Sequence, residues 1–208
     1  MYSFVYLILY QTFAMAIITN FSDLDLDGSY TYADYLKWQF AERIELFRGK
    51  IFKMSPAPNR YHQNVSGNLQ GILWNFFNRN SCNLYAAPFD VRLVKTKSND
   101  EKVTTVVQPD LCVICDENKL DDKGCNGAPD LVVEILSPGN TKKEMGIKFD
   151  LYEENEVKEY WLVDPTEKVI FVYTLQNNKF VGLKPLIEDD VIKSNVFPEL
   201  HFMVAEIF

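Results

Sequence analysis

The sequence lacks an uninterrupted apolar run of the roughly 20 residues that a helix needs to cross a bilayer. The apolar run near its start, residues 4–10, falls well short of that length. No Lys or Arg precedes this run, whereas a secretory signal normally opens with positive charge. We therefore interpret residues 1–14 as a non-native or disordered extension, with a cleaved signal or weak anchor as the alternative, and we expect no stable membrane association.

The chain also lacks an excess of positive charge. It carries 21 Lys and Arg against 29 Asp and Glu, a net charge of -8. This balance opposes tight non-specific binding to phosphate backbones, because each neutralised phosphate needs a Lys or Arg. A local cluster of Lys142, Lys143 and Lys148 can coexist with the negative total, so a nucleic-acid partner is not excluded. We find no helix-turn-helix, zinc finger or aromatic stacking motif that would predict recognition of bases.

Cysteine is scarce, with four residues at positions 82, 112, 115 and 125. Only Cys112 and Cys115 have the spacing of a metal knuckle, and they lie in a strand pattern where this spacing directs side chains to opposite faces. The spacing therefore argues against a zinc site. We expect all four cysteines to be reduced thiols of a cytoplasmic protein.

The chain has enough hydrophobic residues, 47% of 208, to form one sizeable core. We find no internal repeat and no low-complexity tract, and we predict that residues 15–208 form a single domain.

Periodicity and turn signals predict a mixed α/β chain, an α+β fold with a mixed sheet. The core order is helix, three strands, helix, strand, with an N-terminal helix and hairpin and a C-terminal hairpin added. The expected elements are a helix at 31–41, a hairpin of 44–47 with 50–54, a helix at 59–79, strands at 84–94, 104–115 and 129–136, a helix at 141–155, a strand at 160–165 and a hairpin of 169–175 with 180–183.

Acidic residues stand within two of the apolar strand patterns. Asp130 and Glu134 share one side of their strand, because strand side chains alternate between faces, and a neighbouring strand can bring Asp110 beside them. Lys148 falls on the core-facing stripe of the helix that follows, so it points toward the sheet. A carboxylate in apolar surroundings needs a cationic partner, which is either a metal ion or a lysine.

Short patterns with chemical character follow one another along the chain. They are residues 45–50, residues 54–56, His62, Pro109 with Asp110, residues 128–138, Lys148, Tyr152 and residues 159–165. Together with the order of elements, this set resembles the PD-(D/E)XK nuclease superfamily. Within it, the set is most similar to the Uma-two group, a restriction-endonuclease-like family expanded in cyanobacteria. The resemblance covers roughly residues 30–165.

The resemblance implies an endonuclease that hydrolyses phosphodiester bonds of DNA by a metal-activated water. Asp110 and Glu134 would be catalytic residues and ligands of Mg²⁺, with Mn²⁺ as a possible substitute. Lys148 would orient the water or stabilise the phosphorane, and Glu45 would be a further acidic catalytic group. A homodimer, with each protomer cutting one strand, is also implied.

Two more residues are implied at the substrate, and one departs from the pattern. His62 would contact phosphate or support a ligand, and Gln108 would line the site. The superfamily places a lysine two residues after the acidic ligand, but that position is Leu136 here. Our hypothesis is that Lys148, arriving from the following helix, occupies the same space.

Structural readings compete with these roles. For Asp130 we prefer a role in capping or bending the start of its strand to a role as a metal ligand. Lys148 can form a purely structural ion pair with Glu134, or an ordinary helix contact with Glu144. His62 can be a helix histidine whose hydrogen bonds are satisfied within the fold. Glu45 can simply face solvent from its hairpin. The competing function is a catalytically silent, dimeric binding or regulatory protein on a nuclease fold.

Overall fold

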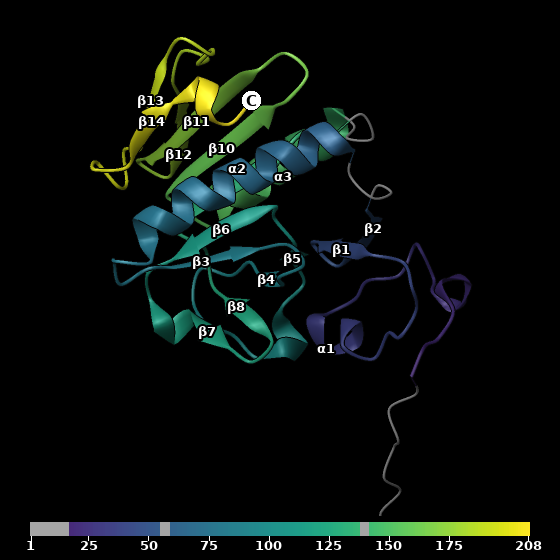
Figure 1. Ribbon diagram of the computed structural model, residues 1–208. Helices are drawn as coiled ribbons and strands as arrows, with labels where there is room; N and C mark the ends of the chain where they lie inside the picture. The colour runs from purple at the N-terminus through teal and green to yellow at the C-terminus, as the bar shows by residue number, and fades with distance from the viewer. Residues whose placement is uncertain (1–16, 55–58, 138–141) are drawn as a thin grey trace, which may run out of the picture.

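The computed structural model describes residues 17–54, 59–137 and 142–208, without the side chains of 142–144 (Figure 1). Our expectations for residues 1–14, for Ser55 and Pro56 in the second short pattern, and for Thr141 as the first residue of a helix lie outside this part of the chain. None of the helices in the described ranges is long and apolar enough to cross a membrane.

A six-stranded sheet, which we call the central sheet, carries the expected core. Its strand order is β12-β11-β10-β9-β6-β3. Strands β9 and β10 run parallel, and the other neighbours are antiparallel. The helix α3 (Lys142–Glu154) connects the parallel pair, as such a crossover requires. The strands are β3 (Asn83–Ala86), β6 (Leu111–Ile114), β9 (Leu131–Ile135), β10 (Glu159–Asp164), β11 (Val169–Gln176) and β12 (Lys179–Gly182).

Two helices cover the two faces of this sheet. Alternate strand residues such as Val133 share one buried cluster with α2 (Arg60–Phe77), whose apolar stripe includes Leu69. The intervening residues, such as Val132, share a second cluster with Leu151 of α3. Figure 1 shows α2 lying lengthwise across the sheets. The period-two alternation of the strands thus produces a helix–sheet–helix arrangement.

A second six-stranded sheet has the order β2-β1-β5-β4-β8-β7. Its strands are β1 (Ile44–Phe47), β2 (Lys50–Lys53), β4 (Val91–Arg92), β5 (Val106–Val107), β7 (Leu120–Asp121) and β8 (Gly124–Asn126). The expected hairpin of 44–47 with 50–54 is confirmed as β1 and β2. Near the C-terminus, β13 (Val191–Lys193) pairs with β14 (His201–Met203), and single 3-10 turns lie at Phe21–Asp23, Asp100–Lys102, Glu117–Lys119 and Val204–Glu206.

Two expected strands are each divided between the sheets. The stretch 84–94 forms β3 and then β4, and the stretch 104–115 forms β5 and then β6. Pro109 interrupts the second stretch because proline has no amide hydrogen for a ladder, and Asp110 beside it is free to turn toward β9. The stretch 116–127, where we expected no strand, contains the short hairpin of β7 and β8.

The first helix is much shorter than expected. Thr31 caps α1 (Tyr32–Tyr35) in a capping box with Asp34, but the helix ends there rather than near residue 41. The chain leaves the helix to pair with an upstream segment, since the Gln39 amide donates to the Ile18 carbonyl at 2.8 Å. Tertiary pairing therefore outweighs the helical periodicity of this segment.

The start of β10 anchors the C-terminal region. Glu159 is fully buried, and its carboxylate accepts hydrogen bonds from Trp161 Nε1 at 2.6 Å and from the Asn195 and Val196 amides at 2.8 and 3.0 Å. Several donors satisfy this buried charge, as such a group requires. Glu159 thereby binds the segment around Asn195 and Val196, which precedes β14, to the start of β10.

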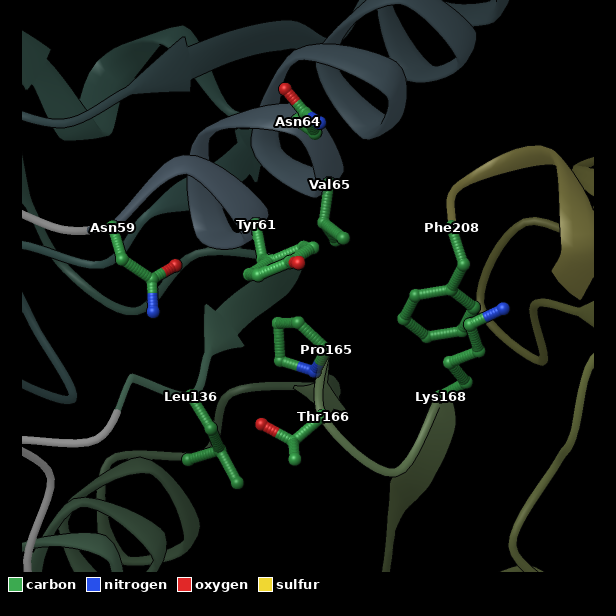
Figure 2. A pocket seen from close by; sticks show the side chains of 9 residues that line it. All are labelled: Asn59, Tyr61, Asn64, Val65, Leu136, Pro165, Thr166, Lys168 and Phe208. Atoms are coloured by element: carbon green, nitrogen blue, oxygen red, sulfur yellow. The ribbon is translucent and has the colours of Figure 1, made fainter.

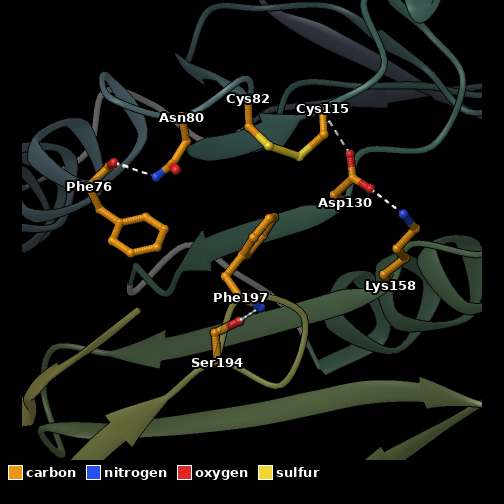
Figure 3. The surroundings of a disulfide bond; sticks show 8 residues. All are labelled: Phe76, Asn80, Cys82, Cys115, Asp130, Lys158, Ser194 and Phe197. Carbon is orange, nitrogen blue, oxygen red and sulfur yellow. Dashed lines mark hydrogen bonds and ion pairs between the residues drawn. A yellow bond between two sulfur atoms is a disulfide. The ribbon is translucent and has the colours of Figure 1, made fainter. Parts of the chain in front are cut away.

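The expectation of four reduced cysteines is wrong for one pair. Cys82 and Cys115 form a disulfide, while Cys112 and Cys125 are buried thiols. Figure 3 shows the bond joining the segments that flank β3 and β6, whose register pairs Asn83 with Ile114. Antiparallel pairing brings the two cysteines opposite each other, which their separation of 33 residues could not reveal. A cytoplasmic location therefore stays a prediction.

We predict that breaking this bond lowers stability, because it closes a loop of 33 residues in the unfolded chain. The loop-entropy relation gives a loss of about 3–4 kcal/mol in the free energy of unfolding. Urea denaturation of the chain with and without reductant measures it. A Cys82→Ser variant is the control, since its midpoint should match that of the reduced wild type and no longer respond to reductant. An unchanged wild-type midpoint on reduction contradicts the prediction.

Candidate active site

Four separate elements bring charged side chains to one place. Glu45 comes from β1, Asp110 from the residue before β6, Glu134 from β9 and Lys148 from α3. The antiparallel register pairs Leu111 of β6 with Val133 of β9 and so sets Asp110 beside the end of β9. Far-apart stretches of sequence thereby converge, as strand alternation predicted for Asp110 and Glu134 and the helical stripe predicted for Lys148.

Lys148 is the centre of this cluster. Its Nζ lies 3.0 Å from Glu45 Oε1 and 3.0 Å from Glu134 Oε1, and the lysine is buried. Burial acts to lower the pKa of Lys148, but the Glu134 and Glu45 carboxylates outweigh it and raise this pKa above its ordinary value. The ammonium group therefore stays charged and bridges two carboxylates.

Glu134 is held by more than the lysine. Burial, with smaller contributions from Asp110 and Glu45, raises the pKa of its carboxyl to about 7, against the lowering effect of Lys148. The Tyr152 hydroxyl donates to Glu134 Oε1 at 2.5 Å, and burial together with Glu134 raises the pKa of that hydroxyl well above its usual value. Tyr152 therefore acts as a donor to Glu134.

Asp110 joins the cluster to α2. Its Oδ2 accepts the Ile135 amide at 2.8 Å, and its Oδ1 lies 3.2 Å from His62 Nε2. His62 is buried on α2, and among the described residues its buried Nδ1 atom has no hydrogen-bond partner. An unpartnered buried nitrogen is uncommon, and such groups concentrate at functional sites.

Gln108 takes a different position from the one expected. Its backbone amide donates to Glu45 Oε1 at 2.8 Å and so fixes the Glu45 carboxylate. Its side chain bonds Arg43 Nη2, Asp90 Oδ1 and the Tyr35 hydroxyl, at 2.8, 2.8 and 3.2 Å. The expected substrate-binding role of Gln108 stays a prediction, and the contacts of this residue are those of a support for Glu45.

Leu136 occupies the position two residues after Glu134, where the superfamily has a lysine. Lys148 reaches Glu134 from α3, and its replacement of that lysine stays a prediction. The alternative pair with Glu144 involves a side chain outside the described part of the protein. Tyr152 was among the short patterns that carry the resemblance but received no role in the site, although its spacing of one helical turn from Lys148 places both side chains on one face.

Asp130 serves the fold rather than the cluster. Its two oxygens bind Lys158 Nζ at 2.6 Å and the Cys115 amide at 2.8 Å, which Figure 3 shows beside the disulfide. This agrees with its interpretation as a strand-end residue, and both oxygens are engaged away from the Lys148 cluster.

The donor set suits a divalent cation only in part. Three carboxylates face one lysine and one histidine, so the cluster has an excess of negative charge. Within the described ranges, however, no three His, Cys, Asp or Glu side chains are arranged to hold one metal ion. Asp110 and Glu134 alone fit Mg²⁺, which commonly binds one or two carboxylates and completes its shell with water and substrate phosphate.

Known proteins resemble this chain in family and in fold. The family model described as "Uma2: Putative restriction endonuclease" matches residues 32–205. An uncharacterized protein of Synechocystis sp. is 29% identical over 143 residues, which cover 67% of this chain and 71% of that protein. A crystal structure described as a putative nuclease belonging to DUF820, from Anabaena variabilis, matches with a TM-score of 0.67 and 20% identity over 86% of this chain and 97% of that one. This likeness confirms the expected fold class.

We predict that Lys148→Met lowers the free energy of unfolding by about 3–5 kcal/mol, because it leaves the buried Glu45 and Glu134 carboxylates without a cation. Urea denaturation followed by circular dichroism measures the loss. The matched control is Lys179→Met, since Lys179 binds Glu153 of the same helix but is 78% exposed, and its loss should change stability little. Equal losses in the two variants contradict a structural role for the Lys148 bridge.

Proposed function

Because the chain belongs to the Uma2 family of putative restriction endonucleases, we propose that it is a Mg²⁺-dependent endonuclease that hydrolyses phosphodiester bonds of DNA. One observation carries the proposal: Lys148 of α3 meets the carboxylates of Glu45 and Glu134 at 3.0 Å, with Asp110 beside them. Two acidic ligands and a lysine are the groups that metal-assisted attack on a phosphodiester needs.

Asp110 and Glu134 are the proposed metal ligands. Their side chains are 22% and 13% exposed, so a part of each stays accessible to solvent, whereas the Glu45 side chain is only 2% exposed. Each Asp110 oxygen accepts one hydrogen bond and keeps a second lone pair. Glu134 Oε1 accepts from both Lys148 and Tyr152, so Oε2 is the proposed metal-binding oxygen of Glu134. When bound, Mg²⁺ offsets negative charge on the reacting phosphate and makes a water a better nucleophile, and Mn²⁺ substitutes for it.

The other residues of the cluster position these ligands and supply positive charge. Lys148 remains protonated, fixes Glu134 and supplies positive charge where the pentacovalent phosphate develops. Glu45, held by the Gln108 amide, fixes the opposite side of the Lys148 ammonium. His62 is a positioning residue for Asp110, since its Nε2 lies 3.2 Å from Asp110 Oδ1.

A second function has its own supporting observation. The Lys148 ammonium already contacts two carboxylates, which is what a closed structural ion-pair cluster requires. This arrangement favours a catalytically silent nuclease-fold protein that binds or regulates, with a homodimer as the expected state. Nucleic acid remains the proposed partner in both cases, and the net charge of -8 makes its binding weak and sensitive to salt.

We predict that Asp110→Asn and Glu134→Gln each lower DNA cleavage at least about 100-fold, because each removes a ligand charge with little change of shape. Lys148→Ala should lose cleavage as well. Initial rates on plasmid and single-stranded substrates with Mg²⁺ are the measurement. Asp150→Asn is the matched control, since this exposed acid lies on α3 two residues after Lys148 and makes the same charge change. Cleavage that survives in all three site variants contradicts the proposal.

We predict saturable binding of Mn²⁺ and Mg²⁺ to the wild-type chain, lost in Glu134→Gln and kept in Asp150→Asn. Isothermal calorimetry of the full chain, with and without a non-cleavable phosphorothioate oligonucleotide, measures it. Binding only with the oligonucleotide indicates a site completed by phosphate. Absence of metal binding under both conditions favours the silent protein over the nuclease.

A further inference from the structure

A pocket of about 470 Å³ opens between the first turns of α2 and the turn that follows β10. We call it the α2–β10 pocket. Figure 2 shows Tyr61 and Val65 reaching it from α2, Pro165 and Thr166 facing them, and the ring of Phe208 closing the far side. These residues come from three parts of the chain, so the pocket is a product of the fold rather than of one loop.

The pocket adjoins the Lys148 cluster through shared elements. Tyr61, which lines the pocket, directly precedes His62, which contacts Asp110. Leu136, which also lines it, directly follows Ile135, whose amide donates to Asp110. The pocket therefore lies at the carboxyl ends of the parallel strands β9 and β10, beside the proposed scissile position. In open α/β sheets this end of the strands is where ligands bind.

The walls suit a flat, weakly polar ligand. Tyr61 is 61% exposed, and its ring, the Pro165 ring and the Phe208 ring border the same space in Figure 2. The Arg60 guanidinium lies over one face of the Tyr61 ring, 5.0 Å from its centroid, so the other face is the one on which an unpaired base can stack. The Asn59 and Asn64 amides and the Thr166 hydroxyl lie around this space, where polar edges of a base can be bonded.

The charges of the pocket do not suit a phosphate. Among the described residues that line it, Lys168 is the one cation, and its Nζ already binds Glu188 at 2.7 Å. A phosphate held here would need an unpaired cation or several aligned donors. A neutral base needs neither, and the volume is sufficient for a nucleoside.

We propose that the α2–β10 pocket holds one unstacked nucleobase of the strand to be cleaved, so that the substrate is single-stranded or locally unpaired nucleic acid. A base within an intact duplex is stacked on both sides and paired, and it cannot enter such a pocket without leaving the helix. This assignment rests on the proposed nuclease function, since it places the base next to the phosphate that the Lys148 cluster attacks.

The test uses the full chain in EDTA, where no cleavage occurs, and a single-stranded thymidine oligonucleotide that carries one 2-aminopurine. Stacking on Tyr61 should quench the 2-aminopurine fluorescence, and titration gives the Kd. We expect Tyr61→Ala and Phe208→Ala each to weaken binding about tenfold and to abolish the quenching. Tyr61→Phe keeps the ring and should bind like the wild type.

Trp74→Ala is the matched control. Trp74 lies on the same helix and is 56% exposed, close to the 61% of Tyr61, but it does not line this pocket. Its variant should bind like the wild type. Equal Kd values for Tyr61→Ala and Trp74→Ala overturn the assignment, and so does equally tight binding of the matching duplex.

Cleavage rates separate this proposal from the function on which it rests. If the wild type cleaves DNA and Glu134→Gln does not, while Tyr61→Ala binds and cleaves like Trp74→Ala, the nuclease stands and the base pocket fails. If the wild type neither binds nor cleaves any oligonucleotide with Mg²⁺ or Mn²⁺, both proposals fail together.

Discussion

The buried ammonium of Lys148 is the constraint on which the arrangement of the site depends. Two carboxylates from distant strands approach it within 3.0 Å, and neither could remain ionised in this position without a cation. The two sheets meet where β1 of the second sheet presents Glu45 and β9 of the central sheet presents Glu134. The Lys148 ammonium therefore links the two sheets to α3. Apolar packing alone would not require charged residues at these positions.

Asp110 connects the two faces of the central sheet. Glu134 points toward the α3 side, where Tyr152 donates to it, whereas His62 approaches from α2 on the opposite side. Asp110 stands at the end of its strand, so it reaches the backbone of β9 and the His62 ring together. This geometry requires a break in the strand pattern, and Pro109 provides it. The interruption that divides the expected strand is thus the feature that frees the acidic residue.

Much of this arrangement could be predicted from the sequence, and the remainder has identifiable physical causes. Strand alternation and the helical stripe correctly directed Glu134 and Lys148 toward each other, because both are local geometric rules. The contact of Lys148 with Glu45 could not be derived in that way, since it depends on how β1 pairs with β5. The disulfide of Cys82 with Cys115 was missed for the same reason, as it depends on the β3–β6 register. Local periodicity also overestimated α1, which ends where the chain pairs with residues far upstream.

The long distance in sequence between Glu45 and Lys148 has a consequence for the order in which the molecule folds. Contacts between remote segments form late, because the chain must first lose the entropy of closing the loop between them. The hairpin that carries Glu45 is local and forms early, but its carboxylate cannot leave water until α3 has crossed the central sheet and delivered the lysine. Assembly of the charged centre is therefore a late event, and a partly folded chain would hold the carboxylates apart and hydrated.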